Sequence, residues 1–315
     1  MEKRKIGKSD LSVYPFALGG NVFGWTADER TSFDILDAYA GAGFNLIDTA
    51  NVYSAWVPGN KGGESETIIG NWLKKSGNRD KMIIATKVGA EISPDNKGLK
   101  KEYIFRQVEE SLRRLQTDYI DLYFTHYDDM TLPVEEPLEA YAQLVKDGKV
   151  RHIGASNMNE FRIQEAIDKS RENNWPEYIC IEPEYNFYDR LQYEVEYEPM
   201  VEEYGLGVIS YYSLASGFLT GKYKFDEAVT GNRSDAVKKY MDSRGRRIID
   251  TLTQVARELN ATPAQVALAW LIARPSVTAP IASVSKVEQL DILKSVDLHL
   301  TPEMLDTLNT VSLQN

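Results

Sequence analysis

Four side chains that can hold or transfer a proton follow three short apolar runs of the sequence. They are Asp48, Tyr53, Lys87 and His126. The apolar runs, at residues 44–47, 82–85 and 120–124, are typical of buried strands. In a parallel barrel, the residues just beyond the strand ends gather at one rim, where such folds carry their catalytic groups. The sequence therefore predicts that these four side chains meet.

A carboxylate, a phenol, an ammonium and an imidazole in one place form a proton-transfer site. We expect the Lys87 ammonium to lower the pKa of the Tyr53 phenol from its reference of about 10. The Asp48 carboxylate would keep the lysine charged and oriented. The His126 imidazole can hydrogen-bond the oxygen that the phenol protonates. This combination favours reduction of a carbonyl group over hydrolysis.

Several segments resemble, in the same order, motifs of the aldo-keto reductase family. They are residues 43–53 (GFNLIDTANVY), 83–87 (IIATK), 117–126 (TDYIDLYFTH), 153–157 (IGASN), and 209–211 (ISY) with 214–222 (LASGFLTGK). The first three carry the four side chains above, which correspond to the catalytic tetrad of that family. The resemblance covers the chain from about residue 4 to about residue 310.

The resemblance implies a reductase of aldehydes or ketones that uses NADPH, with NADH as the alternative cofactor. Tyr53 would be the general acid, a role typically worth about 10²–10⁴-fold in rate. Lys87 would stabilise the tyrosinate left behind and would pair with Asp48. His126 would position the substrate oxygen or share in the proton transfer.

The cofactor contacts also come from the resemblance, because no Gly-x-Gly-x-x-Gly motif follows a strand. Ser156 and Asn157 match the pair that hydrogen-bonds the nicotinamide carboxamide, and Tyr211 matches the tyrosine that stacks on the ring. The stretch that lies over the pyrophosphate supplies Leu214, Ser216, Gly217, Leu219 and Lys222. The stretch that holds the adenosine 2′-phosphate supplies Ser285, Lys286 and Gln289. The alternatives are a helix N-cap for Ser156 and Asn157, a core aromatic for Tyr211 and a plain surface loop for 214–222.

Two positions depart from the family pattern. Many relatives have arginine where this chain has Gln289, which weakens the case for NADPH over NADH. The family usually has a nicotinamide-contacting glutamine where this chain has Glu182, in IEPEYN. An ionised Glu182 would attract the ring when it is oxidised and cationic, and so favour NADP⁺ over NADPH. A protonated Glu182, or one turned toward a loop cation, would not.

Aromatic residues lie on the loops that follow the predicted strands. They are Phe23, Trp25, Trp56 and Tyr127. We expect them to form an apolar or sugar-stacking pocket around the carbonyl group, with loop anchoring as the alternative role.

The composition excludes several other classes of protein. A formal charge of −11 argues against a nucleic-acid partner, because phosphate binding needs a basic face. No window approaches the roughly 20 apolar residues of a membrane span, and no apolar segment of a signal peptide follows the basic start. Cys180 is the only cysteine, and the three histidines lack metal-ligand spacing. We therefore expect a cytoplasmic, metal-free protein that acts on a small-molecule carbonyl substrate.

Short apolar runs alternate with helical patterns along the chain, as in repeated βα units. The predicted strands are 16–18, 44–47, 82–85, 120–124, 150–154, 178–181, 207–210 and 277–281. The predicted helices are 30–41, 64–75, 102–115, 134–147, 159–172, 197–204, 263–273 and 286–294. We therefore predict an α/β protein with one domain, residues 1–315, folded as a (β/α)8 TIM barrel.

Three further features complete this expected fold. Residues 1–14 are expected to form a hairpin, whose natural place is across the bottom of the barrel. Two extra helices are predicted at 246–259 and 302–310. The long segments 54–63, 126–133 and 213–245 all follow strands, so they would form lids or pockets at the catalytic rim.

Two other functions fit the same sequence. The first is a regulatory protein that uses the reductase scaffold to sense nicotinamide redox state, as channel-associated relatives do. The second is an NAD-dependent dehydrogenase that oxidises a sugar or polyol. The sequence leaves the physiological substrate, the direction of the reaction and the oligomeric state open, and a barrel fold decides none of them.

Overall fold

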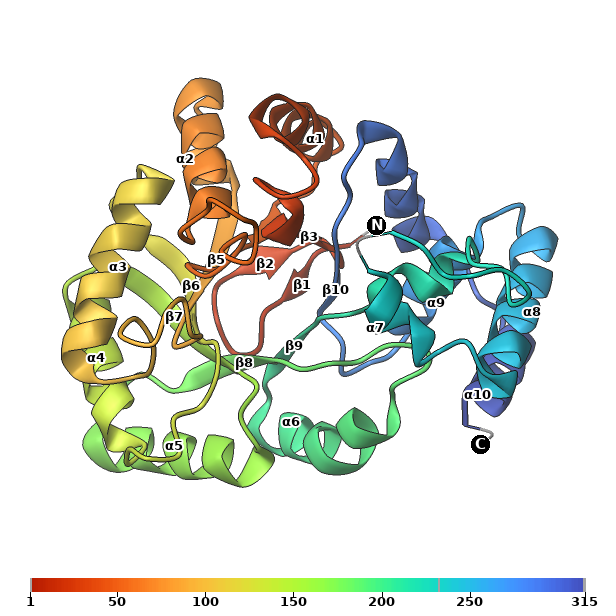
Figure 1. The fold of residues 1–315 in the computed structure, drawn as a ribbon. Coiled ribbons are helices and arrows are strands. Elements are labelled where there is room, and N and C mark those ends of the chain that lie inside the picture. Colours follow the sequence, from red (N-terminus) through yellow and green to blue (C-terminus); the bar gives the residue numbers. More distant parts are fainter. Residues whose placement is uncertain (1, 232, 314–315) are drawn as a thin grey trace.

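Eight parallel strands close into a barrel at the centre of the molecule (Figure 1). The computed structural model describes residues 2–231 and 233–313. The barrel strands are β3 (Ala17–Gly19), β4 (Leu46–Asp48), β5 (Ile83–Val88), β6 (Ile120–Thr125), β7 (Val150–Ser156), β8 (Tyr178–Glu182), β9 (Gly207–Ser210) and β10 (Ala279–Ala282). They pair in chain order, and β10 closes the ring between β9 and β3. The predicted (β/α)8 barrel is confirmed, with all eight strands at the expected places.

Helices surround the barrel and cover the outer faces of the strands (Figure 1). The helices between strands are α1 (Glu29–Gly41), α2 (Glu64–Ser76), α3 (Lys101–Leu115), α4 (Glu135–Lys146), α5 (Glu160–Asn173), α6 (Glu198–Tyr204) and α9 (Pro263–Ile272). The two predicted extra helices are α8 (Ser243–Glu258) and α10 (Pro302–Leu313), and a short α7 (Ser234–Lys238) lies in the long segment after β9. The large core cluster is formed mainly by side chains between the strands and these helices.

Two of these helices show how the local sequence sets their ends or their type. Helix α8 begins three residues earlier than predicted because Asp242 caps it, accepting a hydrogen bond from the Gly245 amide at 2.6 Å. The last predicted helix forms as a 3₁₀ helix, Val287–Asp297. Its inward-facing apolar residues, Leu290, Leu293 and Val296, recur every three positions, which matches the three-residue turn of a 3₁₀ helix.

The first residues close the bottom of the barrel as a hairpin of β1 (Arg4–Lys5) and β2 (Ser12–Val13), which pair antiparallel. Ile6, Leu11 and Val13 pack into the same cluster as the inward-facing barrel residues. Gly7 makes this close approach, with φ of +53° and an ideal Cβ position only 2.1 Å from the Ile179 carbonyl oxygen. Any larger residue there would push the hairpin off the barrel. The expected hairpin is confirmed, and the bottom of the barrel is its observed place.

The barrel interior is a packed layer rather than a pore. Side chains alternate along each strand, so every second residue points inward. The inward residues above the hairpin include Leu46, Ala85, Phe124, Cys180 and Ile209, all of them buried. Gly154 of β7 makes room for Phe124, whose ring would lie 2.5 Å from a Cβ at that position.

Candidate active site

The same alternation positions the candidate residues at the top of the barrel interior. On each strand, the next inward-facing position comes two residues after the residue in the packed layer. This position lies at the end of the strand or just past it. These positions are Asp48, Lys87, His126, Ser156, Glu182 and Tyr211. The period of two along a strand therefore places one side chain from each of six strands around a single point.

Lys87 is at the centre of this group and is fully buried. Its Nζ donates to Asp48 Oδ1 at 2.5 Å, to the Tyr53 hydroxyl at 2.9 Å and to the Thr49 carbonyl oxygen at 3.0 Å. Tyr53 also donates to Asp48 Oδ2 at 3.2 Å. Burial alone would lower the pKa of Lys87, but Asp48, Glu182 and Tyr53 together raise it. The lysine therefore stays an ammonium, as expected from the sequence.

Glu182 is a second carboxyl group beside the same lysine. Its Oε1 lies 3.3 Å from Lys87 Nζ, and its side chain is only 3% exposed. Among the residues that the structure describes, Oε2 has no hydrogen-bond partner. Burial, followed by repulsion from Asp48, raises the pKa of Glu182 to about 8. At neutral pH Glu182 is therefore mainly protonated, so the hypothesis of an ionised Glu182 applies only above that pH.

The acidity of Tyr53 differs from the expectation. Burial and then the Asp48 carboxylate raise the pKa of Tyr53 well above its ordinary value, and Lys87 lowers it by less than these raise it. The predicted net lowering was wrong, because the sequence does not reveal that the phenol is desolvated or that two carboxyl groups adjoin it. The phenol therefore keeps its proton at any pH near neutrality.

His126 completes the tetrad. Its ring centroid lies 6.0 Å from that of Tyr53, and its backbone amide donates to the Val88 carbonyl oxygen at 2.8 Å. Burial, and then the charge of Lys87, lowers the pKa of His126 well below its usual range, so the imidazole is neutral. Its Nδ1 is buried and has no partner in the described part of the chain. A neutral imidazole with a free nitrogen can hydrogen-bond a ligand without adding a charge.

The expected carboxamide-binding pair is already engaged in hydrogen bonds. Asn157 accepts from the Tyr211 hydroxyl at 2.9 Å and donates to the His126 carbonyl oxygen at 2.8 Å. Ser156 donates to the Glu182 carbonyl oxygen at 2.8 Å. These hydrogen bonds link residues at the ends of four neighbouring strands, β6, β7, β8 and β9. The unpartnered Glu182 Oε2 is the buried atom that is available to an amide N–H group of a ligand.

The loop after β9 only partly matches the expected pyrophosphate-binding stretch. We expected this stretch to offer backbone amides and the Lys222 cation to the pyrophosphate. The amides of Gly217 and Leu219 instead both donate to the Leu214 carbonyl oxygen, at 2.8 and 3.2 Å. The backbone at Ala215, Ser216 and Gly217 has positive φ and forms a tight bend, in which the Ala215 amide donates to the Tyr212 carbonyl oxygen at 2.6 Å. The Lys222 Nζ lies beside this bend, 3.6 Å from the Cβ position of Gly217. The Lys222 ammonium group beside this tight bend suits an anionic group of a ligand.

The stretch expected to hold a 2′-phosphate lies after β10. Gln289 Oε1 accepts from the Ser285 amide at 2.8 Å and so shapes the turn instead of pointing outward. Lys286 is exposed, and its ammonium group forms no hydrogen bond or ion pair with any described residue. The Ser285 hydroxyl donates only a long hydrogen bond, at 3.4 Å, to Gln289 Oε1. An unpaired cation beside this turn suits a phosphate group.

Three of the four expected pocket aromatics surround the tetrad. Trp56 packs edge-on against Trp25 and against Tyr53, at ring distances of 5.7 and 6.2 Å, and is 48% exposed. Tyr127 lies 5.1 Å from the His126 ring. Phe23 is the exception: it is fully buried in the hydrophobic core, so its assignment to the substrate pocket was wrong and it anchors its loop instead.

The long segment 213–245 adds a cation that the sequence analysis missed. Arg233 lies over the Trp25 ring, 5.8 Å from its centroid, and has no ion pair with any residue in the described ranges. Burial lowers its pKa. The sequence offers no signal for this placement, because a long loop has no periodicity that would indicate which side chain turns inward.

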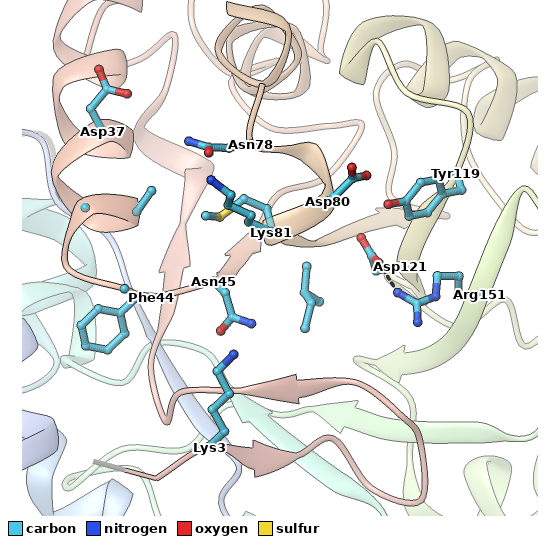
Figure 2. A pocket seen from close by; sticks show the side chains of 15 residues that line it. Lys3, Asp37, Phe44, Asn45, Asn78, Asp80, Lys81, Tyr119, Asp121 and Arg151 are labelled. Carbon is cyan, nitrogen blue, oxygen red and sulfur yellow. Dashed lines mark hydrogen bonds and ion pairs between the residues drawn. The ribbon is translucent and has the colours of Figure 1, made fainter. Parts of the chain in front are cut away.

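A hollow of about 680 Å³ lies at the hairpin end of the barrel, opposite the candidate site (Figure 2). It is lined by residues that precede strands, including Asn45 and Tyr119. Beside it, Asp121 accepts from Arg79 and Arg151, each at 2.8 Å, and from the Ile84 amide at 3.0 Å. These groups satisfy one another, so they hold the bottom of the barrel together and leave nothing buried and unpartnered for a ligand.

Two negative findings apply to residues 2–231 and 233–313. No group of three or more His, Cys, Asp or Glu residues there is arranged to hold a metal ion. No helix in this part of the chain combines the length and the apolar character needed to cross a membrane.

Comparison with known proteins gives one consistent family. The model of the aldo/keto reductase family matches residues 15–312. The uncharacterized oxidoreductase YrpG of Bacillus subtilis is 36% identical and covers 99% of this chain and 96% of its own. A putative voltage-gated potassium channel subunit beta of Schizosaccharomyces pombe is 32% identical and covers 98% and 92%. Protein tas of Escherichia coli is 28% identical and covers 99% and 97%.

Proposed function

Because this chain belongs to the aldo/keto reductase family, we propose that it reduces aldehydes or ketones to alcohols with NADPH. We also propose that residues 1–315 form a single domain. The observation that carries the proposal is the group of Asp48, Tyr53 and Lys87, joined by hydrogen bonds of 2.5 to 3.2 Å, with His126 beside it. A protonated phenol held by an ammonium is suited to donating a proton to an oxygen.

The nicotinamide, when bound, supplies a hydride to the carbonyl carbon. Tyr53 gives its hydroxyl proton to the carbonyl oxygen, and its O–H bond breaks as the new O–H bond forms. Its high pKa keeps that proton in place until negative charge develops on the substrate oxygen. Lys87 Nζ, 2.9 Å away, then stabilises the tyrosinate. His126, neutral and with a free nitrogen, orients the substrate oxygen.

The rim residues fit the cofactor that this reaction needs. Glu182 Oε2 is free for the carboxamide, and the positive-φ stretch at 215–217 with Lys222 suits the pyrophosphate. Lys286 and Ser285 suit the 2′-phosphate, which is why we propose NADPH over NADH. Trp25, Trp56 and Tyr127 would enclose a small aromatic or sugar-like carbonyl compound.

The similarity to potassium channel beta subunits favours one second candidate, a regulatory protein that binds the cofactor to sense its redox state. The tetrad fits either function. The two differ in turnover, because a sensor needs to bind NADPH but does not need to consume it.

The test is a screen of NADPH oxidation with aldehydes, keto-sugars and aromatic ketones, run beside direct titration of NADPH and NADH. Steady-state turnover on any carbonyl class would support the reductase and select its substrate class. Tight NADPH binding with no turnover on any of these carbonyl classes would contradict the reductase and favour the sensor. Stronger binding of NADH than NADPH would contradict the cofactor assignment.

A further inference from the structure

The Lys87 ammonium has fewer donors than it has oxygen neighbours. An ammonium carries three N–H groups, and these are used by Asp48 Oδ1, the Thr49 carbonyl oxygen and the Tyr53 hydroxyl. Glu182 Oε1 lies 3.3 Å from the same ammonium, as a fourth and more distant oxygen neighbour. Oε2 has no partner among the described residues. Glu182 is thus a buried carboxyl group that only shares, at longer distance, the cation that Asp48 holds at 2.5 Å.

Such a group is disfavoured as an anion, since burial penalises charge and the shared Lys87 ammonium compensates it only in part. The titratable groups that face it are Asp48 of β4, Tyr53, Lys87 of β5, Cys180 of its own strand and Tyr211 after β9. Only Lys87 carries a compensating positive charge, and Asp48 already neutralises it. This balance is consistent with the raised pKa of Glu182, about 8.

We propose that Glu182 is a positioning residue that must hold a proton for Tyr53 to act as the acid in carbonyl reduction. With Glu182 neutral, the step that turns Tyr53 into a tyrosinate leaves Asp48, Lys87 and the tyrosinate with a net charge of minus one. With Glu182 ionised, the same step would leave two uncompensated negative charges in one buried site. The ionised form therefore opposes proton donation through Lys87 and Tyr53, without touching the substrate.

The same proton would also be felt by a nicotinamide bound in this site. The ring is cationic when oxidised and neutral when reduced, so ionised Glu182 would favour the oxidised form. As the pH rises and Glu182 loses its proton, the rate of carbonyl reduction would therefore fall. Over the same pH range, the preference for binding NADP⁺ over NADPH would increase. The predicted effect on the reduction rate rests on the proposed function. The predicted effect on the preference between NADP⁺ and NADPH rests only on cofactor binding.

The kinetic test compares wild type, Glu182→Gln and Glu182→Met. Benzaldehyde reduction by NADPH would be followed between about pH 6 and about pH 9.5, below the titration of an ordinary tyrosine. Wild-type kcat should fall by about tenfold per pH unit above the pKa of Glu182. Both neutral variants should stay within about twofold of their neutral-pH value. The matched control is Glu184→Gln, the same change on a half-buried carboxyl group beside Lys239, and it should follow wild type.

An alkaline fall that persists in both neutral variants would overturn the inference, because another group would then be responsible. A merely structural role of Glu182 would lower activity at every pH, and the shape of the profile separates the two.

The binding test distinguishes failure of the inference from failure of the proposed function. Dissociation constants for NADP⁺ and NADPH would be measured by protein fluorescence over the same pH range. In wild type and Glu184→Gln the ratio should shift about tenfold toward NADP⁺ as pH rises through the titration, and in Glu182→Gln it should stay flat. Absence of turnover with this shift present would sink the reductase but support the role of Glu182. A ratio independent of pH in wild type would sink the inference itself.

Discussion

The two ends of the barrel arrange buried charges in opposite ways. At the catalytic rim one cation, Lys87, faces two buried carboxyl groups and a phenol. Acid is in excess there, and Glu182 Oε2 and His126 Nδ1 remain without partners among the described residues. The pKa is shifted in all five of the buried ionisable groups around Lys87, which are Asp48, Tyr53, Lys87, His126 and Glu182.

At the hairpin end one buried carboxylate, Asp121, faces two guanidinium groups, those of Arg79 and Arg151; Figure 2 shows the pair with Arg151. Arg151 continues to Asp10 in the hairpin turn at 2.6 Å, and Asp10 also bonds His152. Here two guanidinium groups balance two carboxylates, and both Asp121 oxygens accept hydrogen bonds. The difference indicates that the rim keeps unused hydrogen-bonding capacity for a ligand, whereas the hairpin end uses its capacity to hold the fold.

Lys87→Met should have the largest effect and should act on activity. We expect kcat for carbonyl reduction to fall by about 10²–10⁴-fold, because the tyrosinate loses its stabilising cation. The pH profile should also change shape, since Lys87 is the cation that faces both Tyr53 and Glu182. The matched control is Lys149→Met, which removes an exposed lysine paired with Glu109 and should leave kcat unchanged. Retained activity in Lys87→Met would contradict the role of Lys87 as the cation that stabilises the tyrosinate.

Asp121→Ala should act on stability instead. Removing one partner of a fully buried ion pair typically costs about 3–5 kcal/mol, and we expect about 2–3 here because Arg151 is 40% exposed. Denaturant unfolding would measure the loss, and kcat should remain within about twofold of wild type. A variant of unchanged stability but lower activity would show that the hairpin end takes part in function.

The two ends should also respond to pH with opposite signs. Glu182 has a raised pKa in the folded state, about 8, against about 4.3 unfolded. The stability associated with its proton is fully present below about pH 4 and is lost as pH rises through about 8. At the other end, the hydrogen bond from His152 lowers the pKa of Asp10, so that contribution is present above the unfolded pKa and lost as pH falls.

The measurement is the unfolding free energy of wild type, Glu182→Gln and Asp10→Asn against pH. Each pKa unit is worth about 1.4 kcal/mol, and with partial compensation by Lys87 we expect Glu182→Gln to gain about 2 kcal/mol over wild type above pH 8. Asp10→Asn should lose less than about 1 kcal/mol, since the pair is exposed, and only above the unfolded pKa of an aspartate, about 3.9. The same pH slope in wild type and Glu182→Gln would contradict the raised pKa.

Lys286→Ala should have the smallest effect, because the residue is exposed. It should weaken NADPH more than NADH and move the affinity ratio by at least about threefold, since only NADPH carries the 2′-phosphate. The control is Lys294→Ala, in the same segment but paired with Asp291, which should leave the ratio unchanged. Equal losses for both cofactors in Lys286→Ala would place the 2′-phosphate elsewhere.

The sequence predicted the elements better than the contacts between them. Strand positions follow from local apolar runs, and the period of two carries Asp48, Lys87 and His126 to one rim. The same period, counted from Cys180, also points Glu182 inward, so its direction was predictable. Its distance from Lys87 was not, because that distance depends on how a closed barrel brings β5 and β8 across from each other.

The remaining misses have the same origin in tertiary structure. Phe23 and Trp25 are close neighbours in the same loop, yet one is buried in the core and the other faces Arg233. The amides of Gly217 and Leu219 are used by the turn of their own loop. The sign of the Tyr53 pKa shift depends on the desolvation of the phenol and on the carboxyl groups beside it, which are properties of the assembled site.

The most direct test of the account is Tyr53→Phe, which removes one hydroxyl group and keeps the ring that packs against Trp56. Carbonyl reduction by NADPH and NADPH binding would be measured on the same preparation. The account predicts that kcat falls by about 10²-fold or more while the dissociation constant for NADPH stays within about twofold. A variant that keeps half of the wild-type activity would contradict the assignment of Tyr53 as the proton donor.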